Sequence, residues 1–277
     1  MKAERPTPDT EPWPGPGTVA VLGFPLDENS SFLRGAAQAP AQIRKALHDG
    51  SSNLSAENAL DLGAHLGWQD LGDIALGRGE EALAQIESAA SGVLARGAKL
   101  LSLGGDHSVT YPILRAFSRH YPNLTVLHLD AHPDLYHELD GNRYSHACPF
   151  ARVMEGGLVQ RLVQVGIRTP NPHQREQARR FGVEVLEMKD WRGELPALEG
   201  PLYLSFDLDV LDPAFAPGVS HHEPGGLSVR EVLRILQGLE LLVGADIVEL
   251  NPLRDVAGVT AKVAAKLYKE LVAQMLQ

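Results

Sequence analysis

Short apolar runs alternate along the chain with amphipathic segments. The apolar runs cover residues 18–24, 99–103, 124–129, 162–167, 183–186, 202–206 and 243–250. Runs of this length without polar alternation are typical of strands that are buried on both faces of a sheet. Segments with helical spacing of apolar residues lie between them, at 79–96, 111–120, 172–181, 228–236 and 257–274. This alternation predicts a three-layer α/β/α fold with a mostly parallel sheet.

The chain is predicted to form one domain after a short N-terminal arm. Its 277 residues suit a single large α/β domain. Residues 1–17 are rich in proline and charge, and they lack the apolar centre of a signal peptide and the arginine- and serine-rich composition of a transit peptide. We therefore expect a flexible arm over residues 1–17, one domain over residues 18–277, and a cytoplasmic protein.

Charge and cysteine content exclude several classes of partner. The 25 Lys and Arg residues are outnumbered by 35 Asp and Glu residues, which gives a net charge of −10. An acidic chain without a basic run is not expected to bind nucleic acid or an anionic membrane surface. The sequence also lacks the run of about 18 apolar residues that a membrane-spanning helix requires. Its single cysteine, Cys148, excludes an intramolecular disulfide and favours a reducing compartment.

Acidic and histidine residues follow four of the predicted strands. They are His107 after residues 99–103, Asp130, His132 and Asp134 after 124–129, Asp207 and Asp209 after 202–206, and Glu249 at the end of 243–250. Because ligands bind at the carboxyl edge of open α/β sheets, we expect these side chains to lie together. Side chains two residues apart point to the same side of an extended chain, so each group can converge on one point.

This set of side chains predicts a binuclear metal site. Four clustered carboxylates would repel one another and take up protons unless cations neutralised them. Two divalent ions would do so, with Asp130 and Asp207 available to bridge them. Carboxylates with two imidazoles and no thiolate favour Mn²⁺ over zinc. Two such ions can activate a water molecule, which indicates metal-assisted hydrolysis. His146, on the loop after residues 124–129, is the candidate general acid.

More ordinary roles exist for the same residue types. A single Asp-x-Asp or Asp-x-His motif is usually a loop carboxylate or a helix cap. The coincidence of three such sites at strand ends favours the metal hypothesis. Asp106 and His128, which adjoin the motifs, are expected to support the ligands and not to bind metal themselves.

The chain resembles the ureohydrolases, the family of arginases and agmatinases. The resemblance rests on Gly-Gly-Asp-His-Ser at 104–108, Asp-Ala-His-Pro-Asp at 130–134 and Ser-Phe-Asp-Leu-Asp-Val-Leu-Asp-Pro at 205–213. Four further segments, at 29–35, 141–147, 217–228 and 244–252, are most similar to the plant-type arginases. The resemblance implies the arginase/deacetylase-like α/β/α fold and a homo-oligomer, either a trimer or a hexamer.

The resemblance also implies roles for individual residues. One Mn²⁺ would be held by His107, Asp130, Asp134 and Asp207, and the other by Asp130, His132, Asp207 and Asp209. His146 would be the proton shuttle, and Glu249 would be the carboxylate that receives the guanidinium.

The favoured reaction is hydrolysis of L-arginine to urea and L-ornithine, with Asn142, Tyr144 and His221 as contacts for the amino-acid end of the substrate. Tyr136 and Asp140 stand where animal-type arginases carry an Asn and a Ser, and residues 218–222 depart from the Gly-Thr-Gly-Thr-Pro of agmatinases. Alternative substrates are therefore agmatine, which would yield putrescine, or another guanidino acid. An alternative of another class is a metal-binding regulator without turnover.

Overall fold

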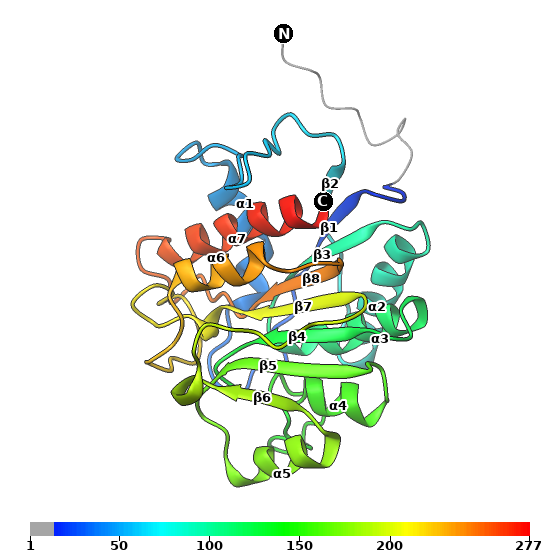
Figure 1. Cartoon of the computed structure of the whole chain (residues 1–277), viewed down its shortest axis with the longest axis vertical. Helices are drawn as coiled ribbons and strands as arrows, with labels where there is room; N and C mark the ends of the chain where they lie inside the picture. The colour runs from blue at the N-terminus through cyan, green and yellow to red at the C-terminus, as the bar shows by residue number, and fades with distance from the viewer. Residues whose placement is uncertain (1–13) are drawn as a thin grey trace.

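The computed structural model describes residues 14–277, which form an eight-stranded parallel sheet with helices on both faces (Figure 1). The strands are β1 (Val19–Phe24), β2 (Trp68–Asp73), β3 (Lys99–Gly104), β4 (Thr125–Leu129), β5 (Arg161–Ile167), β6 (Glu184–Glu187), β7 (Leu202–Asp207) and β8 (Leu242–Val248). Their order across the sheet is β2-β1-β3-β8-β7-β4-β5-β6, and all neighbouring pairs are parallel. The predicted α/β/α fold is confirmed.

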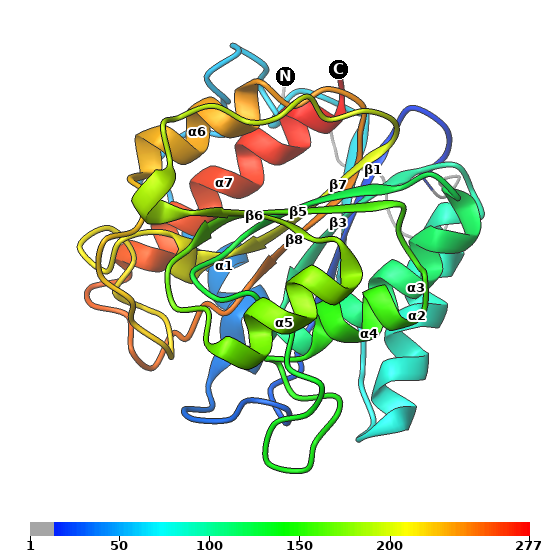
Figure 2. The ribbon, with the colours of Figure 1, turned by 60° about the horizontal axis from the view of Figure 1, so that its bottom comes forward.

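The helices divide between the two faces of the sheet (Figure 2). One face carries α1 (Ala39–His48), α6 (Val229–Gln237) and α7 (Val259–Met275). The other carries α2 (Glu80–Leu94), α3 (Thr110–His120), α4 (Pro149–Glu155) and α5 (Pro172–Phe181). Ser228 caps α6 in a reciprocal pair with Glu231, whose side chain accepts a bond from the Ser228 backbone, so this helix begins where the sequence predicts.

The continuous apolar runs reflect burial on both faces. In β1, Val19 and Val21 pack into the core beneath α1, α6 and α7, whereas Ala20 and Leu22 pack into the core beneath α2 to α5. The same division separates Leu101 of β3 from Leu100. A strand with a core on each side has no polar face, which explains why the strands lack a two-residue alternation.

Three elements are absent from the sequence prediction. The edge strand β2 reads Trp-Gln-Asp-Leu-Gly-Asp and is only half-buried, so it has no apolar run to reveal it. The helix α1 begins at an Ala-Pro pair after a 3₁₀ turn, and α4 has only seven residues. The strand β2 is too polar and α4 is too short for a periodicity argument, whereas α1, with ten residues and a buried face of Ile43, Ala46 and Leu47, is missed although its apolar positions have helical spacing.

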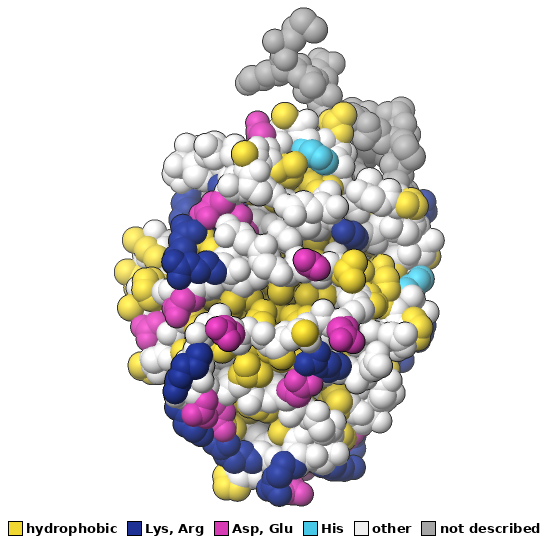
Figure 3. All heavy atoms as spheres, viewed as in Figure 1, with side chains coloured by type: hydrophobic (Ala, Val, Ile, Leu, Met, Phe, Trp, Pro, Cys, Tyr) yellow, Lys and Arg dark blue, Asp and Glu magenta, His cyan; other side chains and the backbone are white. Residues whose placement is uncertain are grey.

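The termini and the surface bear on the other predictions. Of the predicted arm, residues 1–13 lie outside the described residues, while 14–17 enter a turn in which Thr18 donates to the Gly15 carbonyl. Within residues 14–277, no helix is both long and apolar enough to cross a membrane. On the face shown in Figure 3, basic and acidic side chains are interspersed.

Candidate active site

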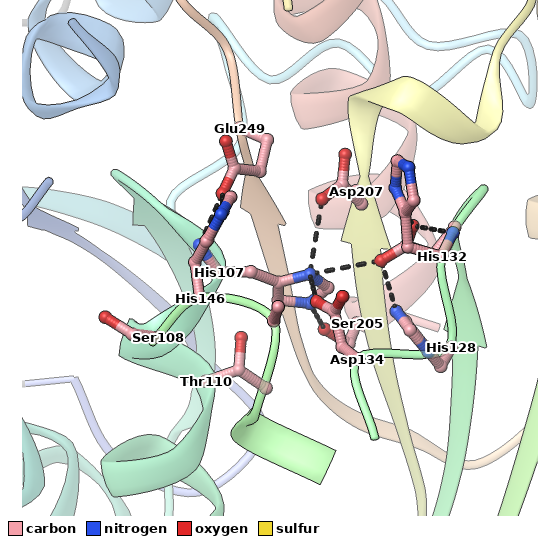
Figure 4. Close-up of polar contacts among 12 residues, drawn as sticks. His107, Ser108, Thr110, His128, His132, Asp134, His146, Ser205, Asp207 and Glu249 are labelled. Carbon is pink, nitrogen blue, oxygen red and sulfur yellow. Dashed lines mark hydrogen bonds and ion pairs between the residues drawn. The ribbon is translucent and has the colours of Figure 1, made fainter. Parts of the chain in front are cut away.

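Four strands in the middle of the sheet supply the site. They are β3, β8, β7 and β4, which are consecutive neighbours, and their carboxyl ends lead into His107, Glu249, Asp207 and Asp130 respectively. Residues from separate parts of the chain therefore meet at one sheet edge, as the motifs predict. Figure 4 shows the side chains of Asp134 and Asp207 directed toward the His107 ring.

His107 is the centre of the first group. Its buried Nδ1 atom lies 2.9 Å from Oδ2 of Asp134 and 3.2 Å from Oδ2 of both Asp130 and Asp207. None of these contacts has acceptable hydrogen-bond geometry, so Nδ1 is a buried polar atom without a hydrogen-bond partner. On the other side of the ring, Nε2 lies 3.0 Å from Ser205 Oγ. An imidazole nitrogen that faces three carboxylates without hydrogen-bonding to any of them fits a shared cation.

His132 forms the second group. Its Nδ1 atom lies 2.9 Å from Oδ2 of Asp209 and 3.4 Å from Oδ1 of Asp130. The two oxygens of Asp130 thus face different histidines, Oδ2 toward His107 and Oδ1 toward His132. Asp130 therefore lies between the two groups, in the position that a bridging carboxylate would need.

The electrostatics of the cluster favour positive charge. Burial and the neighbouring Asp130 raise the pKa of Asp209 to about 6. Burial, Asp209 and Asp130 raise the pKa of Asp207 well above its usual value. Burial would lower the pKa of His107, but the surrounding carboxylates outweigh it and raise that pKa well above its usual value. Raised pKa values at two carboxylates and an imidazole reflect the concentration of negative charge in the cluster, which divalent metal ions would neutralise.

His128 and Asp106 pack beside the cluster. His128 is fully buried on β4, with Nε2 2.7 Å from Asp130 Oδ2 and Nδ1 3.0 Å from the Gln164 amide nitrogen. It lies close enough to His107, Asp130 and Asp134 to belong to a candidate ligand group, which extends the supporting role predicted for it. Asp106 accepts hydrogen bonds from the backbone nitrogens of Asn29 and Ser108, as a structural residue would.

The predicted proton shuttle and guanidinium carboxylate form a buried pair. His146 Nδ1 lies 2.8 Å from Oε1 of Glu249, and that oxygen also accepts a bond of 2.9 Å from the His107 backbone nitrogen. Burial opposes a charge on His146, but the Glu249 carboxylate outweighs it and raises the pKa of His146 to about 9. At neutral pH the ring is therefore an imidazolium, whose Nε2 donates to Ser31 Oγ at 2.8 Å.

Local backbone geometry fixes Glu249. Its φ of 64° is in the left-handed region, which non-glycine residues rarely adopt. The Glu249 backbone nitrogen donates to the Gly105 carbonyl at 2.9 Å. Gly105 in turn packs closely on the segment that follows β1. A Cβ atom at Gly105 would lie 1.8 Å from the Leu26 carbonyl oxygen. The Gly-Gly turn thus brings the backbone segments around His107 and Glu249 together.

A pocket of about 240 Å³ opens beside the cluster. Its walls are formed by the loops at the sheet edge and include Ser31, His132, Asp134, Tyr136, Leu139, His146, Ala147, Thr169, Gln174, Asp207, Asp209, His221, Glu223 and Glu249. Seven of the predicted site residues therefore line one cavity: His132, Asp134, His146, Asp207, Asp209, His221 and Glu249. His107 and Asp130 lie behind the wall, fully buried.

Two of the predicted substrate contacts lie elsewhere. Asn142 and Tyr144 do not line the pocket, whereas His221 does. The Asn142 amide nitrogen donates to Asn29 Oδ1 at 3.1 Å, and its amide oxygen accepts from the Tyr144 backbone nitrogen. The Tyr144 ring stacks on Tyr111. These contacts hold the loop that carries His146, so the two side chains are not directed into the pocket.

The sequence motifs did not identify some of the residues that line the pocket. Ser31 and Glu223 lie inside the motifs at 29–35 and 217–228, but nothing in those motifs singled them out. Thr169 and Gln174 follow β5, whose carboxyl end has no acid or histidine to mark it. Their position after a strand of the same sheet was the available signal.

Proteins of known sequence or structure are similar over nearly the whole chain. A family model described as the arginase family matches residues 17–273. Arginase 1, mitochondrial, of Arabidopsis thaliana is 48% identical over 277 residues, covering 93% of this chain and 81% of the plant protein. The solved arginase from Medicago truncatula has a TM-score of 0.88 at 44% identity, covering 93% of this chain and 87% of that one. The proclavaminate amidino hydrolase from Streptomyces clavuligerus has a TM-score of 0.87 at 35% identity, covering 99% and 98%.

The similarity corrects the predicted location. The prediction of a cytoplasmic protein is wrong, because the similar arginase of Arabidopsis thaliana is named as mitochondrial. The prediction had relied on the composition of residues 1–17 and on a single cysteine, and neither feature distinguishes the cytoplasm from a reducing organelle.

Proposed function

The chain belongs to the arginase family, and from this premise we propose that it hydrolyses L-arginine to L-ornithine and urea. The observation that carries the proposal is the pocket in which the predicted metal cluster and the His146–Glu249 pair face the same cavity. A guanidinium ion is planar and cationic, and it would enter a pocket whose walls hold five carboxylates.

We propose two Mn²⁺ ions as the cofactor. His107, Asp130, Asp134 and Asp207 would hold one ion, and Asp130, His132, Asp207 and Asp209 would hold the other. When bound, the ions would supply an activated water molecule as the nucleophile. The choice of manganese is supported by the carboxylate-rich donor set, which contains no thiolate, since the buried Cys148 does not line the pocket.

The chain's own residues bind the guanidinium and move the proton. The Glu249 carboxylate accepts N–H bonds from the guanidinium and orients its central carbon toward the metal cluster. His146 holds its proton at Nε2 on the pocket side, where it can be donated to the nitrogen of the departing amine. Ser31 Oγ, on an exposed residue, contacts that nitrogen and offers a route for its reprotonation.

A second substrate, agmatine, is favoured by one specific observation. Among the residues that line the pocket, none is a lysine or arginine, so the carboxylate of arginine has no cationic partner there. Agmatine lacks that carboxylate and would be processed by the same residues. A regulator without turnover has no observation in its favour, because the complete set of predicted catalytic side chains lies in or beside one pocket.

A urea-release assay tests the proposal. The purified protein, loaded with Mn²⁺, is offered arginine, agmatine, 4-guanidinobutyrate and guanidine in parallel. We expect urea from arginine, and weaker release from the other compounds. Absence of urea with every substrate at full metal occupancy would contradict the proposal. Sedimentation of the same sample would test the trimer or hexamer that the family resemblance implies.

A further inference from the structure

One acidic side chain in the pocket has no place in the machinery described above. Of the five carboxylates in the pocket wall, Asp134, Asp207 and Asp209 belong to the metal cluster, and Glu249 pairs with His146. The fifth is Glu223. Its side chain is 36% exposed, compared with 3% for Asp207 and 5% for Glu249. Glu223 therefore lies at the mouth of the pocket, whereas the other carboxylates lie at its base.

The backbone of Glu223 is held firmly in this position. Its carbonyl oxygen accepts hydrogen bonds from Nε and Nη2 of Arg168, at 2.9 and 2.6 Å. The same guanidinium donates to the carbonyls of Asp209 and Gly166, at 2.6 and 3.1 Å. Arg168 thus ties the loop of Glu223 to the segment that carries a predicted metal ligand. Because the backbone is already fixed, only the Glu223 side chain has to be ordered when it binds a ligand.

The Glu223 carboxylate is available to a ligand. The nearest charged group recorded for it in the described chain is Nε2 of His132, at 4.0 Å, which is beyond hydrogen-bond distance. No lysine or arginine of the described chain forms an ion pair with this carboxylate, and the nearby Arg168 guanidinium donates its hydrogen bonds to backbone carbonyls. A carboxylate with open lone pairs beside a concave site favours a cationic ligand group.

From these observations we infer that Glu223 is a specificity-determining residue, which binds an ammonium group at the end of the substrate remote from the guanidinium. The inference rests on the proposed function, because it takes the guanidinium to lie against Glu249. The selected class is then guanidino compounds with a second positive group, such as arginine and agmatine. Guanidino acids without an amino group, such as 4-guanidinobutyrate, place a carboxylate near Glu223 and are disfavoured.

The test compares Glu223→Gln with the wild-type enzyme on substrates of different distal charge. Gln has nearly the same shape and lacks the negative charge. We expect KM for arginine and agmatine to rise about 5- to 20-fold with little change in kcat, because a partly exposed charged hydrogen bond is lost from substrate and transition state alike. For 4-guanidinobutyrate, KM should fall. Butylguanidine, which is neutral at that end, should change by less than twofold.

A matched variant and a metal analysis separate this role from others. Glu194→Gln removes the same charge from an exposed position outside the pocket wall, and it should leave all four KM values unchanged. If Glu223→Gln instead lowers kcat for every substrate equally and reduces metal content, Glu223 orients His132 and the inference is wrong. Equal KM changes for all four substrates would also overturn it. If the wild-type enzyme releases no urea at all, the proposed function has failed, which is a different result.

Discussion

The side chains of His146 and Glu249 meet at 2.8 Å although 103 residues separate them in the sequence. His146 comes from the loop between β4 and α4, and Glu249 follows β8. Each residue depends on the other, because the buried imidazolium compensates the buried carboxylate. In the proposed function, Glu249 would therefore act on both the substrate and the proton donor.

The pKa of His146 should fall when this carboxylate is removed. In protein stripped of metal by a chelator, we expect His146 to titrate near pH 9 and the Glu249→Gln variant to titrate at a lower pH, because burial then opposes the charge with less compensation. A folded-state pKa above the unfolded value stabilises the fold below about pH 6.5, and this stabilisation is lost as pH rises through about 9. NMR titration of the histidine ring protons measures both values. Glu184→Gln, which removes the carboxylate paired with Arg161, should leave the His146 titration unchanged.

Loss of the His146 ring should impair turnover without emptying the site. We expect His146→Ala to lower kcat about 10²- to 10⁴-fold, the range for removal of a positioned acid or base, with both metals retained. Ser31→Ala should cause a smaller loss, because water can replace the exposed hydroxyl. Steady-state kinetics and metal analysis of the two variants decide this. Wild-type turnover in His146→Ala would exclude the proton-shuttle role.

Asp130 should be the least replaceable of the acidic residues. Its two oxygens face His107 and His132, so Asp130→Ala is expected to abolish activity and metal retention together. Elemental analysis after gel filtration provides the measurement. The control is Asp61→Ala, which changes an exposed aspartate distant in sequence from the predicted metal ligands. A variant that keeps two ions per chain and normal turnover would refute the assignment of the cluster.

The support behind His107 should tune metal affinity. Ser205 Oγ contacts Nε2 of His107 at 3.0 Å and donates to Asp246 at 2.8 Å, so it fixes the orientation of the ring. Loss of such a supporting contact typically costs about 10- to 100-fold in metal affinity, which we expect for Ser205→Ala. Competition with a fluorescent chelator gives the dissociation constants. Ser118→Ala, which removes a hydroxyl bonded only within α3, should match the wild type.

Gly105 should not tolerate a side chain. The Cβ atom of Gly105→Ala would lie 1.8 Å from the Leu26 carbonyl oxygen, so the backbone must move. Because His107 and Glu249 depend on the same turn, we expect lower thermal stability, weaker metal binding and lower activity together. Thermal unfolding followed by circular dichroism tests the first of these. Gly92→Ala, in open space on α2, should be neutral or slightly stabilising.

The part of this molecule that the sequence makes predictable is the part governed by local rules. An apolar run predicts a buried strand such as β4. The spacing of Asp130, His132 and Asp134 after that strand predicts that their side chains converge. The outer wall of the pocket depends on side-chain conformation instead. Asn142 had the right residue type and the right loop, yet its amide is turned toward Asn29. Glu223 is directed to the pocket by Arg168, a contact across 55 residues that no local pattern encodes.

The position of β8 between β3 and β7 has a consequence for how the protein is made. These two strands do not pair with each other, so within the described sheet β8 joins the half that carries His107 to the half that carries Asp207. Residues 242–248 follow both β3 and β7 in the sequence, so the ribosome, which adds about 5–20 residues per second, makes β8 after the two strands that it joins. A nascent chain can pair β4 with β7 early, but it cannot yet bring His107 beside Asp207. We therefore expect cation capture to follow the synthesis of β8, so that a chain interrupted before residue 242 sequesters no metal at His107.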